Sequence, residues 1–377
     1  MRNRLMAVLA VLMTGLALVP PAMGNGNGEP AAACTPYFPL KDGWLGGDAA
    51  YSVPLSDGRM LWLFGDTFIG RPGARDRKDA TLVGNSIALS ACRDGEWRLD
   101  YAWRQGDGLP EAMFVPPDAH ATTHEVRYWP LDGFVHDGVL YVFLSRVRTT
   151  DADDPLGFAI EGVDMARVEG LHLSPADWRI TYLPVLRGVP ALPGTAVLNQ
   201  EKHVLLYAPL TGEAEKDRPV ALARLPLDGL GTPQVRLQYL ARDGGWADGF
   251  DPARAQRIMD KGSTELSVHE EKGDGRFVAV LNESAFPSDR VVLRTAPAPE
   301  GPWTEDFAVE LIAERAPGEK APDPRLFCYA AKAYEPGTAG ATLMLIYICN
   351  STEADLLLND MSIYRPRTRR VTLPRVP

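Results

Sequence analysis

The chain has 377 residues and a formal net charge of −10 at pH 7, and 45% of its residues are hydrophobic. No Lys/Arg-rich tract is present, which argues against nucleic acid or an anionic membrane as partner and favours a neutral or cationic ligand. A chain of this length can bury a large core in a single repeat or barrel domain.

Residues 1–24 are predicted to be a secretory signal peptide. Arg2 and Arg4 provide a positive start, residues 5–19 form an apolar run, and Ala22 and Gly24 are small residues at the two positions that a signal peptidase reads. The apolar run is shorter than the roughly 20 residues of a transmembrane helix, although an uncleaved anchor is the alternative. We therefore expect a periplasmic or secreted protein that has no membrane span after cleavage.

Residues 25–377 are predicted to be one all-β domain, a five-bladed β-propeller. One pattern recurs: a strand, an Asp/Gly turn, a very apolar strand that ends in a polar residue, and outer strands that often close on Trp. Strands that are apolar on both faces are expected between neighbouring sheets, and radial repetition supplies such neighbours. A two-sheet sandwich is the alternative. The five copies span approximately residues 44–105, 124–184, 193–242, 262–315 and 326–375.

Two further elements are expected outside this pattern. Asp251-Pro252 is a good cap and first-turn pair, and it predicts a helix over residues 251–259. Residues near Tyr37 are expected to complete the last sheet and so close the propeller.

Four cysteines in an exported chain indicate two disulfides, for which three pairings exist. We favour Cys328 with Cys349, because they flank a predicted hairpin and can face each other across it. Cys34 with Cys92 then follows by elimination, and this bond would attach the N-terminal segment to the first sheet. No cysteine or histidine spacing indicates zinc.

The propeller topology nominates a site. The innermost strands all run in the same direction, so the start of the first strand, the end of the second and the start of the third lie on one face. Reading these positions gives acids, amides, aromatics and cations, the groups that bind sugar hydroxyls and sugar rings. The catalytic candidates are Asp48, Asp66 and Glu265; the substrate-binding candidates are Asn85, Glu125, Arg127, Tyr128, Arg146, Tyr329, Lys332 and Asn350.

Asp48 and Asp66 are the strongest candidates. They stand at the two open ends of one predicted hairpin, so antiparallel pairing brings them together at the mouth of the channel. Two neighbouring carboxylates can divide acid and base roles, as glycosidic hydrolysis requires. The alternative is that both are turn aspartates that accept backbone N–H groups. Glu265 is a candidate remote acid, or else an ion-pair partner of Lys261 or a nearby arginine.

Other polar residues are assigned simpler roles. Arg127 and Arg146 are candidates for neutralising buried carboxylates as well as for binding substrate. His124 is more typical of a surface loop than of a general acid, and His203 and His269 are expected to be solvated near hairpin turns. No cofactor is predicted; a structural calcium ion is compatible with the acidic and amide side chains, but no loop signature requires one.

Three segments of the first copy resemble a bacterial family of formerly unknown function. They are residues 46–52, 61–70 and 84–86, and shorter matches follow at residues 300–303, 329–332, 350–351 and 364–367. Members of that family have been recognised as endo-D-arabinanases with a five-bladed propeller fold. The resemblance implies that Asp48 and Asp66 are the catalytic carboxylates. The related family-43 glycoside hydrolases would place a glutamate acid in the third blade, but Glu201 falls in a turn on the opposite face.

The sequence therefore predicts an exported glycoside hydrolase that acts on a furanoside polysaccharide, most simply an arabinan. The alternative is a propeller without catalytic activity that binds carbohydrate or assembles at the cell surface. Both readings make a polysaccharide or oligosaccharide the partner, and we expect a monomer. A Ser-His-Asp hydrolase does not fit, because no Gly-x-Ser-x-Gly elbow is present.

Overall fold

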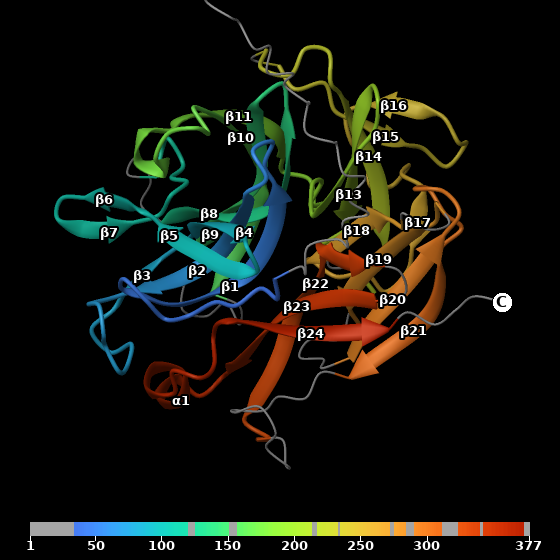
Figure 1. The fold of residues 1–377 in the computed structure, drawn as a ribbon. Coiled ribbons are helices and arrows are strands. Elements are labelled where there is room, and N and C mark those ends of the chain that lie inside the picture. Colours follow the sequence, from blue (N-terminus) through green and yellow to red (C-terminus); the bar gives the residue numbers. More distant parts are fainter. Residues whose placement is uncertain are drawn as a thin grey trace, which may run out of the picture. The chain divides into compact units, whose positions relative to one another are not determined.

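The computed structural model describes residues 34–119, 125–150, 157–212, 217–232, 234–271, 275–283, 290–310, 323–339 and 342–372 (Figure 1). Strands dominate these residues. The helices among them are α1 (Ala354–Asn359) and a 3-10 turn over Pro175–Asp177. In the part of the chain that is described, no helix is long and apolar enough to cross a bilayer.

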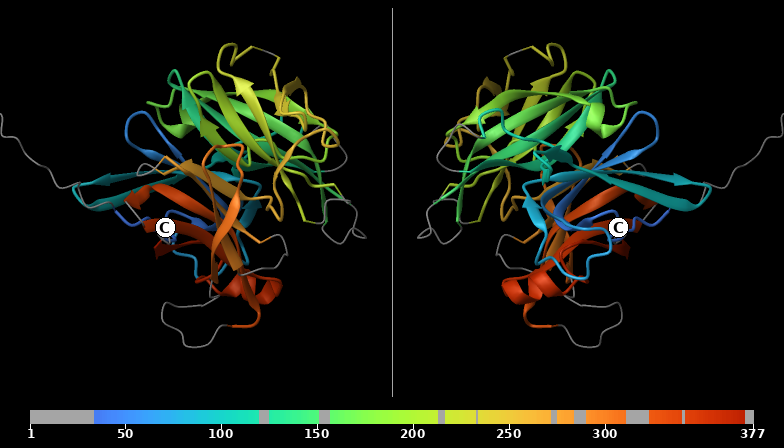
Figure 2. Two further views of the ribbon diagram at one scale, coloured as in Figure 1. Left: turned by 90° about the vertical axis from the view of Figure 1, so that its right-hand side faces the viewer. Right: turned by 90° about the vertical axis from the view of Figure 1, so that its left-hand side faces the viewer.

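The first two blades are antiparallel sheets built from consecutive strands. The strands of the first blade are β1 (Trp44–Pro54), β2 (Met60–Ile69), β3 (Thr81–Val83), β4 (Ser86–Arg93) and β5 (Glu96–Ala102). A small hairpin of β6 (Arg104–Gly106) and β7 (Leu109–Glu111) projects beside it (Figure 2). The strands of the second blade are β8 (Val126–His136), β9 (Val139–Thr149), β10 (Phe158–Glu169) and β11 (Arg179–Arg187).

The other three blades repeat the arrangement. The third contains β12 (Ala196–Asn199), β13 (His203–Pro209), β14 (Val220–Pro226), β15 (Gln238–Leu240), β16 (Trp246–Asp248) and β17 (Arg257–Met259). The fourth contains β18 (Leu266–Glu270), β19 (Phe277–Asn282), β20 (Arg290–Ala296) and β21 (Thr304–Glu310), and the fifth contains β22 (Leu326–Ala339), β23 (Thr342–Ser351) and β24 (Pro366–Thr372).

The innermost strands form a closed ring. Going round it, β1 contacts β8, β8 contacts β12, β12 contacts β18, β18 contacts β22, and β22 returns to β1. The predicted all-β, five-bladed propeller is therefore confirmed, and its central channel is lined by five strands that run in the same direction.

A separate hydrophobic core lies between each pair of neighbouring blades. The core between the fifth and first blades, for example, contains Trp62 and Tyr334, whose rings stack with centroids 5.2 Å apart. The other four pairs of neighbours each have a comparable cluster of buried side chains. This is why the central strands are apolar on both faces: each face packs against another blade. Burying a large apolar side chain contributes about 1.5–3 kcal/mol, so the ring is held mainly by these cores.

Two predicted elements are wrong. Residues near Tyr37 do not pair with the last sheet; the backbone carbonyls of Tyr37 and Pro39 instead accept hydrogen bonds from Trp97 and Tyr101 of the first blade. Side-chain packing closes the ring, so no extra strand is required. Residues 251–259 form turns and the short strand β17 rather than a helix, because the segment pairs with β14.

Both predicted disulfides are present. Cys328 lies directly opposite Cys349 in the β22–β23 ladder, and the two are bonded. Cys34 is bonded to Cys92, which attaches the start of the described chain to β4. Disulfides persist in oxidising compartments, so this chemistry is consistent with export.

His269 differs from its predicted solvated position. It lies on β18 with 3% of its surface exposed, and neither ring nitrogen has a hydrogen-bond partner. Burial lowers the pKa of its imidazole from 6.5 to about 4. Between these two values the unfolded chain binds a proton that the folded chain does not, so stability falls as the pH falls through this window.

This burial predicts an acid-sensitive stability. Lowering the pH from 7 to 4 should reduce the free energy of unfolding of the native chain by about 3 kcal/mol through His269. The His269→Phe variant, which has a ring of similar size that does not titrate, should not show this loss. Urea unfolding at both pH values measures the difference. Changing the exposed His172 to Gln is the control, and equal acid losses in the native chain and His269→Phe would contradict the prediction.

Candidate active site

Asp48 and Asp66 lie on the paired strands β1 and β2, at the end of the channel where β1 begins. The pairing is irregular here: Gly47 is opposite Thr67, Ala49 is opposite Phe64, and the register shifts between them. Ala49 and Ala50 follow with φ angles of 62° and 60°, a left-handed conformation that costs a non-glycine residue about 1–2 kcal/mol each. Strain of this kind is concentrated at functional sites.

Gly65 makes room for the Asp48 carboxylate. A Cβ atom at Gly65 would lie 2.5 Å from Oδ1 of Asp48, a separation that real Cβ atoms do not show. On its other side, Oδ2 of Asp48 accepts a hydrogen bond of 2.8 Å from the Tyr329 hydroxyl of β22. The carboxylate is therefore fixed between its own hairpin and the fifth blade.

The surroundings of Asp48 favour its protonated form. Burial raises its pKa from 3.8 to about 8, helped by the negative charges of Asp66 and Glu265 and opposed by the Tyr329 hydroxyl and the Lys332 ammonium. A carboxyl with this pKa keeps a proton at neutral pH and can donate it.

Asp66 has different partners. Its Oδ1 accepts a hydrogen bond of 2.8 Å from Nε1 of Trp129 and lies 3.7 Å from Nε of Arg127. Burial raises the pKa of Asp66, the Arg127 cation and the Trp129 N–H oppose that rise, and the negative charge of Glu125 adds to it. The two carboxyls therefore differ in their partners, since Asp48 has a hydroxyl donor while Asp66 has a cation and an indole N–H, and unequal surroundings are what separate acid and base roles.

Glu265 and Lys332 form a third charged unit beside this pair. Nζ of Lys332 donates a hydrogen bond of 2.8 Å to Oε1 of Glu265 and another, of 2.9 Å, to the carbonyl oxygen of Ala330. It also lies 4.2 Å from the centroid of the Tyr51 ring. Only 3% of the Lys332 side chain is exposed, and burial lowers its pKa. Glu265 thus pairs with Lys332, and not with the Lys261 or arginine considered from the sequence.

Partly exposed aromatic rings flank the carboxyls. Trp129 packs edge-on against Phe158, with ring centroids 4.7 Å apart, and Phe327 lies 5.7 Å from Tyr329. Aromatic faces of this kind can stack on the apolar face of a sugar ring. The second blade therefore contributes a ring on the Asp66 side and the fifth blade contributes one on the Asp48 side.

Several substrate-binding candidates have structural roles instead. Asn85 is fully buried, and its amide donates to the carbonyl oxygens of Phe114 and Tyr128 and accepts from the Phe114 N–H. Tyr128 is also fully buried in the core between the first two blades, where its hydroxyl donates to Asp164. Neither side chain is available to a ligand in the channel.

Three other candidates have contacts that do not involve the side chains of the carboxyl pair. Arg146 makes two hydrogen bonds of 2.8 Å to Asp118 and one of 3.0 Å to Glu161, so it does neutralise carboxylates, but partly exposed ones rather than the buried ones expected. Glu125 is exposed and acts on Asp66 only through its charge. Oδ1 of Asn350 accepts from the backbone N–H of Ser351. His124 lies outside the described residues.

Tyr364 is a site residue that the sequence reading missed. It is buried, and its hydroxyl donates a hydrogen bond of 3.0 Å to the backbone carbonyl of Asp66. It lies just before β24, the third strand of the fifth blade. This position, just before the start of a third strand, is the sequence signal that identifies it.

A solved structure shares the fold over most of the chain. A candidate hydrolase from Bacteroides ovatus superposes with a TM-score of 0.69 at 18% identity, covering 88% of this chain and 86% of that one. An exo-1,5-alpha-L-arabinanase from a bovine ruminal metagenomic library gives a TM-score of 0.45 at 13% identity, covering 86% of this chain and 94% of that one. Bacillus subtilis levansucrase gives 0.47 at 11% identity, covering 92% and 90%.

The sequence comparisons give a family without a described activity. No curated protein matches the chain in sequence. Residues 33–372, which include all the site residues discussed above, match the family described as "Domain of unknown function (DUF5005)". The chain belongs to this family.

Proposed function

We propose that the protein is an exported glycoside hydrolase that cleaves a furanoside polysaccharide such as an arabinan. One observation carries the proposal: two carboxyls sit at one end of the channel, one with an uncharged hydroxyl donor and a strongly raised pKa, the other with a cation and an indole N–H. Glycosidic hydrolysis needs such a pair, with one carboxyl protonated and the other ionised.

The partners assign the two roles. Asp48 keeps its proton and donates it to the glycosidic oxygen as the bond to the leaving sugar breaks. Asp66, whose ionised form is stabilised by Arg127 and Trp129, attacks the anomeric carbon or activates a water to do so. The configuration of the first product, followed by NMR, distinguishes these two routes, because attack by Asp66 leads to retention and attack by water leads to inversion.

Glu265 contributes charge rather than a proton in this proposal. Its carboxylate is engaged by Lys332, and its negative charge raises the pKa of Asp48. The partly exposed rings of Trp129 and Tyr329 are suited to hold sugar residues on either side of the cleaved bond. We retain Lys332 as a residue that orients the site, since its ammonium is buried and fully engaged.

The setting of the protein follows from the same proposal. A signal peptide over residues 1–24, which lie outside the described part, and two disulfides fit a periplasmic or secreted protein. The partner is a polysaccharide or oligosaccharide, the chain acts as a monomer, and no cofactor is required. Within the described ranges, no three acidic, histidine or cysteine side chains gather as a metal site, and a structural calcium ion stays a prediction.

Product analysis tests the activity. The mature protein is incubated with D-arabinan and, separately, with L-arabinan, and the products are sized by chromatography. Release of oligosaccharides that stops in Asp48→Asn and Asp66→Asn supports the proposal. Full activity in both variants would remove these residues from the mechanism, and no products from any furanoside polymer would reject the hydrolase.

A propeller that binds carbohydrate without cleaving it is the second candidate. The 3.7 Å approach of Arg127 to Asp66 favours it, because a carboxylate neutralised by an arginine can be structural. Asp48 has no comparable ion pair among the described residues, which favours the hydrolase. Retention of the protein on immobilised arabinan, with no products released, would support the binding role.

The indole of Trp129 gives a prediction about pH. Trp129→Phe removes the N–H that donates to Asp66, so the pKa of Asp66 should rise by about one unit and the acidic side of the pH–activity profile should move upward with it. Steady-state rates across the pH range measure the shift. Trp97→Phe removes an N–H bonded to Tyr37, away from the channel, and should leave the profile unchanged; identical profiles for both variants would contradict the role of Trp129.

A further inference from the structure

The other end of the channel contains a cavity that the proposed catalysis does not use. On β1, Asp48 comes before Tyr51–Pro54, which line the cavity; likewise Glu265 directly precedes β18, and Ser267–Glu270 of that strand line the cavity. Because the innermost strands run in the same direction, the cavity lies toward the end of the channel opposite Asp48. Lys332 lies between the carboxyl pair and the cavity: its ammonium is hydrogen-bonded to Glu265, and the residue also lines the cavity.

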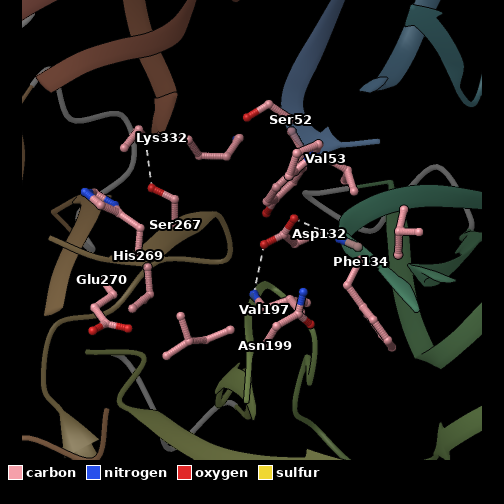
Figure 3. Close-up of a pocket in the computed structure, with 17 residues that line it drawn as sticks. Ser52, Val53, Asp132, Phe134, Val197, Asn199, Ser267, His269, Glu270 and Lys332 are labelled. Atoms are coloured by element: carbon pink, nitrogen blue, oxygen red, sulfur yellow. Dashed lines mark hydrogen bonds between the residues drawn. The ribbon is translucent and has the colours of Figure 1, made fainter. Parts of the chain in front are cut away.

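The cavity has the size and the lining of a small-ligand site. Its volume is about 310 Å³, and every innermost strand contributes to its wall. Four of these strands, β1, β8, β12 and β18, carry the polar residues labelled in Figure 3: Ser52, Asp132, Asn199, Ser267, His269 and Glu270. Ligand pockets in proteins begin at about 300 Å³, so this one suits a single monosaccharide-sized molecule and not a polymer.

Two deeply buried polar groups of the lining lack well-formed hydrogen bonds. His269 is 3% exposed, and neither ring nitrogen makes a hydrogen bond; Tyr51 is 2% exposed, and its hydroxyl lies beside the backbone of Leu266 without a hydrogen bond of good geometry. Buried polar groups are almost always satisfied, because leaving one unpaired costs about 1–3 kcal/mol. Other polar side chains of the same wall do have partners. Asp132 accepts hydrogen bonds from the backbone N–H groups of Gly133 and Val197, and Ser267 accepts one from that of Ala333.

The unpaired groups define the chemistry of the occupant. A hydroxyl and a neutral imidazole each offer a donor and an acceptor, which matches a molecule that carries several hydroxyl groups. The carboxylates of Asp132 and Glu270 disfavour an anion, whereas the Lys332 ammonium disfavours a cation. We propose that this cavity binds a small neutral polyol, of the size of a free pentose, through Tyr51 and His269. The inference does not rest on the proposed hydrolase activity, because the two sites lie at different ends of the channel.

Site-resolved titration tests the proposal. The mature protein is labelled with ¹⁵N in its histidine rings and titrated with D-arabinose, L-arabinose and D-xylose, and the His269 signal is followed by NMR. We expect a saturable shift for at least one pentose, with affinity weakened about tenfold in Tyr51→Phe. Tyr101→Phe, which loses a hydroxyl bonded to Pro39 outside the channel, is the matched control and should keep the affinity of the native chain.

The remaining outcomes are also decisive. Asp48→Asn should leave the His269 shift unchanged, which separates this site from the carboxyl pair. If Tyr51→Phe does not fold, Ser52→Ala and Asn199→Ala at the same wall take its place. No saturable shift with any pentose, equal affinity in Tyr51→Phe and Tyr101→Phe, or a pentose-soaked crystal with only water in the cavity would overturn the proposal.

Discussion

Asp48→Asn is expected to lower kcat/KM on the furanoside polymer by about 10²–10⁴-fold, the usual contribution of a general acid. The amide has the shape of the carboxyl and can still accept the Tyr329 hydroxyl, but it has no proton to donate to the leaving sugar. In the native chain, activity should decline above a pH of about 8, where Asp48 loses its proton. The residual activity of the variant should lack that alkaline decline.

The same variant should be more stable than the native chain at alkaline pH. The pKa of Asp48 is about 8 in the folded chain and 3.8 ordinarily, so the stability that its protonated form contributes is present below 3.8 and is lost as the pH rises through 8. The side-chain amide of the variant does not titrate, and its relative advantage therefore grows between these values. Thermal unfolding at pH 4 and at pH 9 measures this difference.

The combination of lost activity and raised stability separates a catalytic role from misfolding. Asp66→Asn should lose activity to a similar extent and should also lose the acidic side of the profile, because Asp66 acts in its ionised form. Asp100→Asn, at a side chain that is 86% exposed, is the control and should match the native chain. A variant at Asp48 that is less stable at alkaline pH and retains its activity would contradict the assignment.

The paired aspartates could be predicted because their position depends on one local relation. Residues at the two open ends of a β-hairpin are close whatever the rest of the fold does. The Cys328–Cys349 pairing follows from the same relation, and the structure places the two opposite each other in one ladder. Lys332 and Tyr329 were found because β22 starts on the same face of the ring as β1.

The environments of Asn85, Tyr128 and Arg146 could not be predicted in this way. In strands buried on both faces, polar and apolar residues do not alternate, so the sequence does not reveal which side chains face the channel and which face the next blade. Tyr128 points into the core between the first two blades, and Asp164 on β10 supplies a partner that no local pattern indicates. His269 was expected near a turn for a related reason, since the sequence does not show that β18 continues past it to Glu270 and that it is buried there.

Register shifts add a second uncertainty, because a shift of one residue moves every following side chain to the other face. The ladder between β22 and β23 shifts between Tyr329 and Lys332, beside Ala330 with a φ of 58°. The first hairpin shifts in the same way next to Asp48. These irregularities bring Asp48, Tyr329 and Lys332 toward one another, and no composition or periodicity in the sequence indicates them.

Gly65→Ala is expected to reduce kcat/KM by about 10²-fold without unfolding the protein. The new methyl group would lie 2.5 Å from Oδ1 of Asp48, so the carboxylate must move by about 1 Å to avoid it. A displacement of about 1 Å in a catalytic group can lower the rate about 10²-fold. Gly65 does not have a left-handed φ, so alanine fits its backbone, and the fold should retain most of its stability.

Gly245→Ala provides the matched control for this prediction. Gly245 is also a glycine without a left-handed φ, but it lies in an exposed turn between β15 and β16, far along the chain from the carboxyl pair. Its variant should keep both activity and thermal stability. If Gly65→Ala kept full activity, the fixed position of Asp48 would not matter to the chemistry. If instead it lost activity while the pH profile kept its alkaline decline, the displaced Asp48 would still be the acid, and the close fit between Gly65 and Asp48 would be what sets the rate.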